Sequence, residues 1–430
     1  MCDTFVAFGS ATVDGSVLLA KNADTEVNEA QHLVRFPARD YAEGALVRLS
    51  HITIPQARRT HEVVLNKSFW TWGAEIGFNE HGLAAGNEAV FSNQAPERDG
   101  VMIIDLLRLV LERARDCDEA VDVVAWAIES FGQGGNCELR GNSHFDGSLL
   151  VADREGAVII ETAGREWAAR RVDDFGSISN VIGIRDTWHR SSLEKSGGAG
   201  ADFRERFADL AVSANTAAEE RQLESESFLQ RRHGRINART MMDLLRYTGE
   251  EADYHPAAGD RPCHICMHAG PYPNRLWQAT GSMVSEVRGD AVIGWMTGAS
   301  GPDVSVFKPL LPGVEFPDLG PMPRETWTEG AYWWRHEHLH RRAMADYRAV
   351  VPEIRAEFEA IEDGFLAEAA SVLRADHATR SAFVHDCWAQ AIEAEERWAR
   401  KLADRPYRIE HASYRDMWEG FNRAASLTLD

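Results

Sequence analysis

The chain opens with two apolar runs that are separated by a strong turn signal. Residues 3–10 (DTFVAFGS) and 16–21 (SVLLAK) are rich in strand-forming residues, and Asp14-Gly15 lies between them. An Asp-Gly pair favours a tight hairpin turn, because the central residues of such turns need positive φ. The sequence therefore predicts an N-terminal antiparallel hairpin. It carries Cys2 on its first strand and brings Lys21-Asn22-Ala23-Asp24 back toward it.

Further strands and helices alternate in groups along the chain. Two amphipathic patterns predict an antiparallel helix pair after the first group of strands, and later patterns predict two more helices. A strand group, a helix group and a second strand group indicate an α+β fold with helices outside the sheets. The predicted strands are 32–36, 62–65, 82–90, 148–152, 157–161, 178–184, 282–287 and 291–296, and the predicted helices are 101–116, 118–131, 203–220 and 238–248.

The pattern changes near residue 328. From Tyr332 to Phe365 apolar residues recur at intervals of three and four, and the same pattern continues over residues 366–403. This spacing is typical of helices that bury one face. We therefore expect a main domain over residues 1–327 and a helical C-terminal extension, residues 328–430, packed on it.

Charge and cysteine usage exclude several classes of protein. A net charge of −21 argues against nucleic acid and against anionic membrane surfaces, because both carry negative charge. No apolar run approaches the roughly 20 residues that span a bilayer, and no signal-peptide pattern is visible. The six cysteines are sparse and irregularly spaced, unlike a disulfide framework. These features predict a cytoplasmic protein, and they leave open whether it forms a homo-oligomer.

Cysteine at position 2 is either a chance occurrence or a catalytic N-terminus. Removal of Met1 would expose the α-amino group of Cys2, whose unperturbed pKa of about 7.7–8.0 suits a base for the thiol. The predicted hairpin brings Lys21 and Asp24 to the same end, where they would supply a cation and a carboxylate. Charged residues also end many ordinary strands, so this placement alone does not decide between the two interpretations.

Several stretches of the sequence together resemble one enzyme family. They are MCDTFVA with VDGSVLLAKNAD at the start, GFNEHGLAAGNEAVFS (77–92), SISNVIGI (177–184), HICMHAG (264–270), GSMVSEV (281–287) and WMTGASGPDVSVFKPLLPG (295–313). This combination resembles the N-terminal nucleophile (Ntn) hydrolases of peptidase family C69, the dipeptidase and secernin group. The resemblance spans roughly residues 2–340, and it implies a four-layer αββα sandwich.

The resemblance also implies roles for individual residues. Cys2 matches the nucleophile, with its α-amine as base, and Asp24 matches the carboxylate that orients the amine. Lys21 stands where related enzymes commonly have arginine, so it keeps a point charge but loses the bidentate fork. Asn87 matches an oxyanion asparagine, and Asn180 a second structural or oxyanion asparagine.

The implied reaction is cleavage of a short peptide with a free N-terminus, through a thioester on Cys2. Glu80 and Glu88 are candidates for binding the substrate ammonium, and Cys266 and His268 for positions near the cleft. The resemblance implies no cofactor and no metal. A secernin-like protein that keeps the fold but only binds a partner remains an alternative.

Two further motifs suggest metal chemistry. His336-Glu337-His338-Leu339-His340 matches H-E-x-x-H, in which two histidines on one helix face bind zinc, so a zinc peptidase is a second alternative. Three nearby arginines and the lack of a third ligand motif weigh against it. Cys263 and Cys266 form a C-x-x-C pair, but no second pair completes a zinc site.

Overall fold

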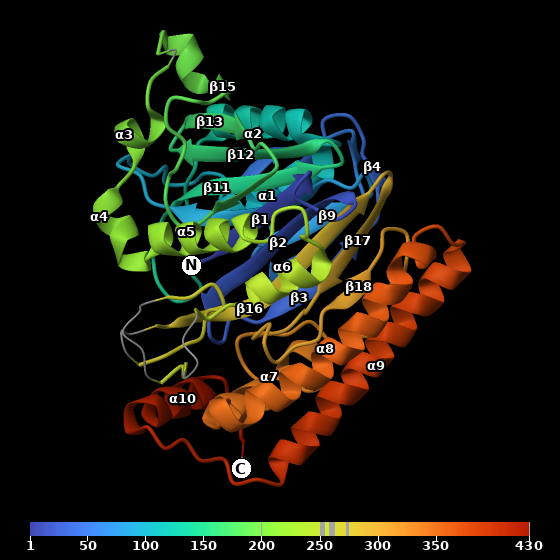
Figure 1. Cartoon of the computed structure of the whole chain (residues 1–430). Coiled ribbons are helices and arrows are strands. Elements are labelled where there is room, and N and C mark those ends of the chain that lie inside the picture. Colours follow the sequence, from blue (N-terminus) through green and yellow to red (C-terminus); the bar gives the residue numbers. More distant parts are fainter. Residues whose placement is uncertain (199, 250–253, 258–262, 272–274, 430) are drawn as a thin grey trace.

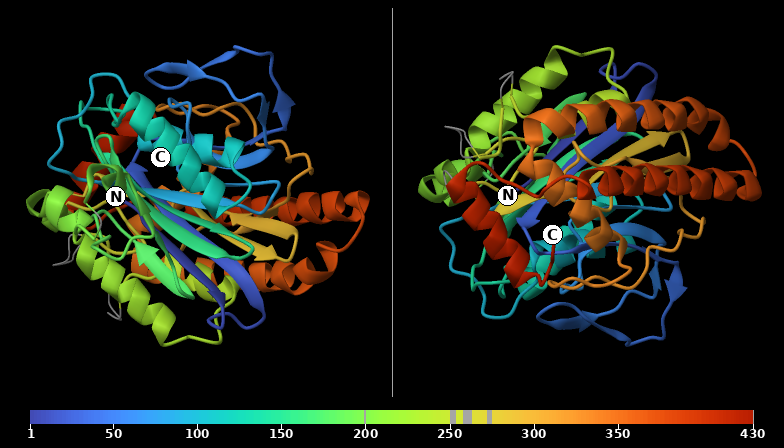
Figure 2. Two further views of the ribbon diagram at one scale, coloured as in Figure 1. Left: turned by 90° about the horizontal axis from the view of Figure 1, so that it is seen from above. Right: turned by 90° about the horizontal axis from the view of Figure 1, so that it is seen from below.

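The computed structural model describes residues 1–198, 200–249, 254–257, 263–271 and 275–429. Two β-sheets pack face to face, and helices cover the outer face of each (Figures 1 and 2). The predicted four-layer αββα sandwich, an α+β fold, is thereby confirmed. Among the described residues, no helix is both long enough and apolar enough to cross a membrane.

The first sheet has six antiparallel strands and is built around the N-terminal hairpin. Its order is β14 (Phe175–Ile178), β1 (Asp3–Gly9), β2 (Gly15–Glu26), β16 (Trp277–Arg288), β17 (Ala291–Met296) and β18 (Lys308–Leu310). The hairpin is confirmed, but its turn is longer than the Asp14-Gly15 signal predicts. Residues 10–14 form the connection, and Gly9 and Gly15 take the positive φ values.

The second sheet has eight strands and faces the first. Its order is β15 (Arg190–Ser191), β13 (Glu166–Arg171), β12 (Gly156–Ala163), β11 (Asp146–Asp153), β10 (Ala84–Val90), β9 (Ile76–Asn79), β8 (Val63–Ser68) and β3 (Gln31–Phe36). Two short ladders lie outside it, β4 (Arg39–Asp40) with β7 (Arg59–Thr60) and β5 (Leu46–Arg48) with β6 (Thr53–Pro55).

The two sheets approach each other closely where Gly86 of β10 faces the hairpin. A Cβ atom on Gly86 would lie 2.6 Å from Thr4 Oγ1 and 2.7 Å from Lys21 Cδ. Only glycine fits so close a backbone approach. The glycine of the AAGNEA stretch therefore allows Lys21 to lie between the two sheets.

Helices α1 (Ile103–Arg113) and α2 (Cys117–Phe131) pack on the eight-stranded sheet. The predicted helix pair is thus confirmed. Helix α2 begins where Asp116 accepts a hydrogen bond from the backbone of Glu119, and it ends at Gly132, whose φ is +69°. On the opposite side, α5 (Ala218–Gln230) and α6 (Ala238–Leu245) cover the six-stranded sheet (Figure 1).

Two sequence predictions in this region are wrong. The single helix expected over 203–220 is broken into α3 (Phe203–Phe207), α4 (Leu210–Ser213) and the short 3₁₀ turn η2 (Ala214–Thr216), before α5 begins; η1 (Ser192–Ser196) precedes them. Asp209 caps α4, and Ala217 takes a φ of +50°, which no helix continues through. The strand expected over 178–184 ends at Ile178, so Asn180 lies in the following loop.

The C-terminal part is helical, as predicted, with α7 (Tyr332–Ala345), α8 (Tyr347–Val372), α9 (His377–Ala403) and α10 (Ala412–Ala424). Helices α8 and α9 form a long pair beside β18 (Figure 1). Trp388 of α9 donates a hydrogen bond to the carbonyl of Pro309 in β18, at 3.0 Å. Arg341 of α7 binds Asn28, just beyond β2, at 2.7 Å. These helices therefore hold both the edge of the first sheet and the end of the hairpin.

Candidate active site

Cys2 lies directly before β1 and is almost fully buried. Because Asp3 pairs with Asn22 in the hairpin, residue 2 lies beside Asp24, and the Asp24 amide is 3.3 Å from Cys2 Sγ. The terminal amino group, carried here by Met1, donates to the Asp24 carbonyl at 2.9 Å. Cys2, Asp24, Asn87 and Asn180 all line one cavity of about 370 Å³. The structure thus brings these four predicted residues together.

The Asp24 side chain is buried, and neither of its carboxylate oxygens has a hydrogen-bond partner among the described residues. Burial raises the pKa of Asp24 well above its usual range, although the terminal amino group opposes this shift. Buried polar atoms are normally satisfied, and each exception calls for an explanation. This carboxylate therefore lies close enough to the terminal amino group to interact with its charge, without a hydrogen bond from any described residue.

Lys21 lies at the centre of the site, fully buried between the sheets. Its ammonium donates to the Asn87 carbonyl and lies 3.7 Å from Glu88 Oε1. Burial disfavours the charge, but the Cys2 thiol, Glu88 and Glu75 outweigh it and raise the pKa of Lys21. Burial raises the pKa of the Cys2 thiol to about 11, and Lys21 counteracts this shift. Lys21 is therefore a fixed positive charge beside the thiol.

The two asparagines approach Cys2 from different elements. Asn87, on β10, lines the cavity, and its Nδ2 donates to the Ala74 carbonyl at 3.3 Å. Asn180 accepts a hydrogen bond from the Cys2 amide at 3.0 Å, while its own Nδ2 donates to the Ala89 carbonyl at 2.9 Å. Asn180 therefore fixes the backbone of Cys2, and Asn87 faces the cavity.

Arg221 of α5 is a site residue that the sequence analysis missed. Its guanidinium is fully buried, pairs with Asp3, and donates to the Cys2 carbonyl at 3.2 Å and to Asn180 Oδ1 at 2.7 Å. From the helical layer, Arg221 thus holds Cys2 and Asp3, at the start of the chain, in place. Its only sequence signal is a single basic residue in the acidic stretch AEERQLESE.

Four other predicted site residues lie elsewhere. Glu80 is in the exposed turn between β9 and β10, and Glu88 is fully buried against Lys21 and Thr4. Cys266 and His268 belong to a separate buried cluster with Asp303, in which His268 Nε2 lies 3.0 Å from Asp303 Oδ2. None of the four lines the cavity at Cys2, so the expectation that they contact substrate does not fit the structure.

Other acidic residues and another cysteine line the cavity, where we expected Glu80, Glu88 and Cys266. Glu75, Glu29 and Glu26 line it, as does Cys263 in place of Cys266. Burial raises the pKa of Glu29 to about 7 and also raises the pKa of Glu75. Trp70 donates to Glu29 Oε1 at 2.8 Å. The rest of the wall is largely apolar and includes Trp70, Phe91, Met102, Ile103, Ile104, Phe145 and Trp277.

The H-E-x-x-H motif lies in α7, as expected, but its side chains are engaged in structural contacts. His336 Nε2 lies 3.0 Å from both Ser305 Oγ and the Ser300 carbonyl, whereas His340 contacts Glu337. Glu337 also pairs with Arg341 at 2.7 Å. The two histidines thus contact different partners, and this arrangement does not support a zinc peptidase.

Comparisons with known proteins give one family and several solved structures. A family model described as acyl-coenzyme A:6-aminopenicillanic acid acyl-transferase matches residues 12–130. The chain is similar to penicillin V acylase from Agrobacterium tumefaciens, with 14% identity, coverage of 68% of this chain and 82% of that chain, and a TM-score of 0.41. It is also similar to a variant of conjugated bile acid hydrolase from Clostridium perfringens (10%, 68% and 88%, TM-score 0.40).

A third similar structure is the N-acylethanolamine-hydrolyzing acid amidase ortholog of Caenorhabditis elegans, with 15% identity, coverage of 66% and 92%, and a TM-score of 0.35. Membership of peptidase family C69 is not confirmed by these comparisons. Residues 12–130 match a family of Ntn-type acyl-transfer enzymes.

Proposed function

We propose that the protein is a cysteine-type Ntn amidohydrolase that cleaves short peptides, a dipeptidase of the C69 kind. Cys2 is the nucleophile, and its own α-amine, freed by removal of Met1, is the base. The observation that carries this proposal is Asp24: its backbone contacts Cys2 Sγ and the chain's amino group, and its buried carboxylate, on which that amino group acts electrostatically, has no hydrogen-bond partner among the described residues. A carboxylate in this position orients an N-terminal amine and stabilises its protonated form.

The reaction proceeds through a thioester. The α-amine takes the thiol proton, and Cys2 Sγ attacks the substrate carbonyl carbon. The carbon–nitrogen bond then breaks, and the leaving amine takes a proton from the α-ammonium. Water attacks the thioester with the α-amine again as base, which releases the acid and restores the thiol.

The surrounding residues stabilise charge and hold the reacting atoms in place. Asn87 supplies an amide N–H toward the developing oxyanion, and the ammonium of Lys21 favours the thiolate. Asn180 and Arg221 hold the amide and carbonyl of Cys2, which fixes the direction of the thiol. We assign them positioning roles.

The cavity suits a substrate that is both cationic and apolar. Glu75 and Glu29 are buried acids on its wall, and one carboxylate is what an α-ammonium group requires. The aromatic and aliphatic wall would bury the side chains of a short peptide. Glu75 therefore replaces Glu80 and Glu88 as our candidate for binding the substrate ammonium. The absence of disulfides among the six cysteines is consistent with the expected cytoplasmic setting.

A second candidate is an acylase that hydrolyses N-acyl amides. It is favoured by the family-model match and by the apolar wall. The two candidates differ at the group beside the scissile amide, because a dipeptide presents an ammonium there and an N-acyl substrate presents a hydrocarbon chain. The acidic residues of the wall favour the dipeptide.

A substrate panel separates these functions. Purified protein is assayed with free dipeptides, with the same dipeptides N-acetylated, and with N-acyl amino acids, each with and without EDTA. We expect efficient cleavage of free dipeptides and only slow cleavage of their N-acetylated forms, unaffected by EDTA, abolished in Cys2→Ala and retained in the buried-cysteine control Cys387→Ser. Cleavage of N-acyl amino acids alone would favour the acylase. A folded protein that cleaves nothing would favour the binding-protein alternative.

A further inference from the structure

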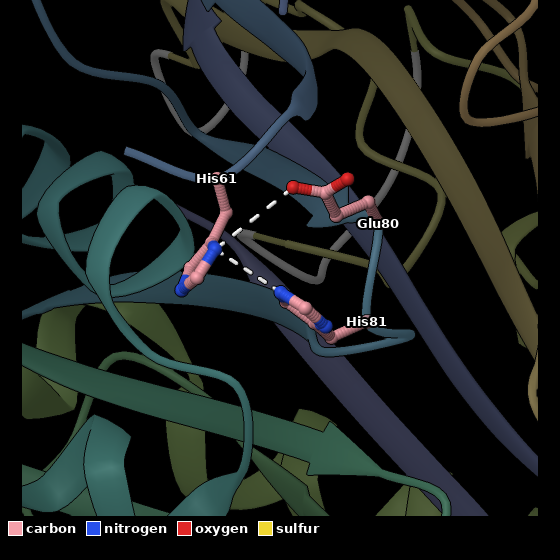
Figure 3. Close-up of side chains that lie close together, drawn as sticks. All are labelled: His61, Glu80 and His81. Atoms are coloured by element: carbon pink, nitrogen blue, oxygen red, sulfur yellow. Dashed lines mark hydrogen bonds and ion pairs between the residues drawn. The ribbon is translucent and has the colours of Figure 1, made fainter. Parts of the chain in front are cut away.

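A second group of ligating side chains lies at the far end of β9 from Glu75. His61 precedes β8, and Glu80 and His81 form the turn between β9 and β10 (Figure 3). The two imidazoles face each other edge to face, with His81 Nε2 3.0 Å from His61 Nδ1. Glu80 Oε1 lies 3.9 Å from the same His61 nitrogen. Three donor atoms thus converge on one point.

Hydrogen bonds hold the backbone segments that carry these three side chains. Asn79 Oδ1 accepts hydrogen bonds from the amides of His81 and Leu83, and Gly82 takes a φ of +81°, which locks the turn. The His61 amide donates to the carbonyl of Glu112 at the end of α1, at 2.8 Å. The cluster therefore rests on ordered elements from two parts of the sheet and one helix.

The spacing is suited to a small transition ion. Two nitrogens bound to one tetrahedral zinc ion at about 2.0–2.1 Å lie about 3.3 Å apart. This is close to the observed distance of 3.0 Å between His81 Nε2 and His61 Nδ1. A small rotation of the partly exposed Glu80 side chain would bring its carboxylate into the third position. His81 is exposed, so the fourth position opens to solvent.

The electrostatic surroundings favour a cation at this point. Glu119 adds negative charge near His61, and Arg115, which also acts on His61, is paired with Glu119. Each imidazole can ligate through the nitrogen that faces the cluster once a proton is carried only on its other ring nitrogen.

The other candidate group, Cys266, His268 and Asp303, is less suited to a metal ion. Tyr254 lies 3.0 Å from His268 Nδ1, and Tyr347 donates to Asp303 at 2.9 Å. His268 and Asp303 also contact each other, so both ring nitrogens of His268 and Oδ2 of Asp303 are engaged inside the cluster, whereas Asp303 Oδ1 has no hydrogen-bond partner among the described residues. The burial of this cluster gives an ion no open coordination position.

We propose that His61, Glu80 and His81 form a binding site for a divalent transition ion such as zinc, separate from the cavity at Cys2. The nitrogen and carboxylate donors exclude calcium and magnesium, which prefer all-oxygen sites. A bound ion would link His61, which precedes β8, to the β9–β10 turn. It would thereby stabilise this end of the sheet beside α1.

The test is titration of zinc chloride into chelator-treated protein, followed by calorimetry. The variants are His81→Ala, Glu80→Gln and the control His233→Ala, which removes a histidine paired with Asp174 elsewhere. All retain the six cysteines, so differences report on the cluster. We expect one site per chain in the wild type and the control, absent in His81→Ala and weakened roughly tenfold in Glu80→Gln.

Thermal unfolding gives a second readout, because an ion that binds only the folded state raises the unfolding temperature. Zinc should raise it in the wild type and in His233→Ala, but not in His81→Ala. Equal zinc binding by the wild type and His81→Ala would show an adventitious ion only and would overturn the proposal. Absence of zinc binding by the wild type would overturn it as well.

Discussion

The carboxylates in two buried groups of charged residues have pKa values that are shifted in opposite directions. Around Cys2, burial raises the pKa of Asp24, of Glu75, of Glu29 to about 7 and of Glu88 to about 8. In the C-terminal helices, burial is outweighed by Arg341 beside Glu337 and by Lys308 beside Glu395. The pKa of each of these acids falls to about 2.

The difference lies in the partners. Glu337 and Glu395 each have a buried cation within hydrogen-bond distance, so their charges are compensated. At the site, Lys21 lies among several acids, Arg221 is paired with Asp3, and the Asp24 carboxylate accepts no hydrogen bond among the described residues. Groups with raised pKa values around a cavity are typical of function, whereas compensated pairs are typical of structure. The following predictions test that division.

Removing the Asp24 charge should affect activity most. Asp24→Asn loses the carboxylate that orients the α-amine, so kcat/KM for the cleaved dipeptide should fall by about 10²- to 10⁴-fold. Thermal unfolding should change little, because no side chain in the described part of the chain donates a hydrogen bond to this group. Asp14→Asn, at the other end of the same hairpin, is the control. Near-normal activity in Asp24→Asn would contradict the assignment.

The C-terminal group should behave in the opposite way. Glu337→Gln leaves the buried guanidinium of Arg341 without its counter-charge, which should lower the free energy of unfolding by about 3–5 kcal/mol. Denaturant unfolding measures this loss. The surface variant Glu396→Gln, whose partner Arg335 is partly exposed, should lose about 1 kcal/mol or less. Equal losses in the two variants would remove the distinction between the regions.

Glu75→Gln should alter selectivity and leave the chemistry intact. Loss of a charged hydrogen bond of about 1.5–3 kcal/mol lowers kcat/KM for free dipeptides by about 10- to 100-fold. The kcat/KM for any N-acetylated peptide that the enzyme turns over should not fall, because it carries no ammonium. Measuring both substrates in wild type and variant checks this. An equal fall for both would place Glu75 in the chemical step.

The pH dependence of stability should reflect both groups of buried carboxylates, one on the acid side and one on the alkaline side. The lowered pKa values of Glu337 and Glu395 give stability that is present above about pH 4.5 and lost as pH falls toward 2. The raised pKa values of Glu29 and Glu88 give stability that is present below about pH 4.5 and lost as pH rises through 7 to 8. Calorimetric unfolding temperatures should therefore peak near pH 5. Glu29→Gln should flatten the decline on the alkaline side, and an unchanged decline would contradict the assignment.

The sequence predicts those parts of the site that depend on local pairing. The alternating apolar runs of the hairpin align Cys2 with Asp24 even though the turn is longer than expected, because the strands and not the turn set the register. Asn87 is found through its motif. The αββα layers are implied by the family resemblance, and the order of strand and helix groups agrees with them.

Contacts between distant segments are not visible in the sequence. Arg221 reaches Cys2 across more than two hundred residues, and nothing in its helix marks it. Glu88 shares a strand face with Gly86, so it points toward Lys21 between the sheets and not into the cavity. Glu80 belongs to the same motif as Asn87, yet it lies in a turn at the far end of β9 from Glu75, which occupies the cavity.

The central claim is that the α-amine of Cys2 activates its own thiol, and the most direct test is the intact mass of an active preparation. Our account predicts that catalytically active protein lacks Met1 and forms its acyl adduct on residue 2. An active preparation that retains Met1 in full would contradict it, because the amide nitrogen of Cys2 would then carry no basic lone pair.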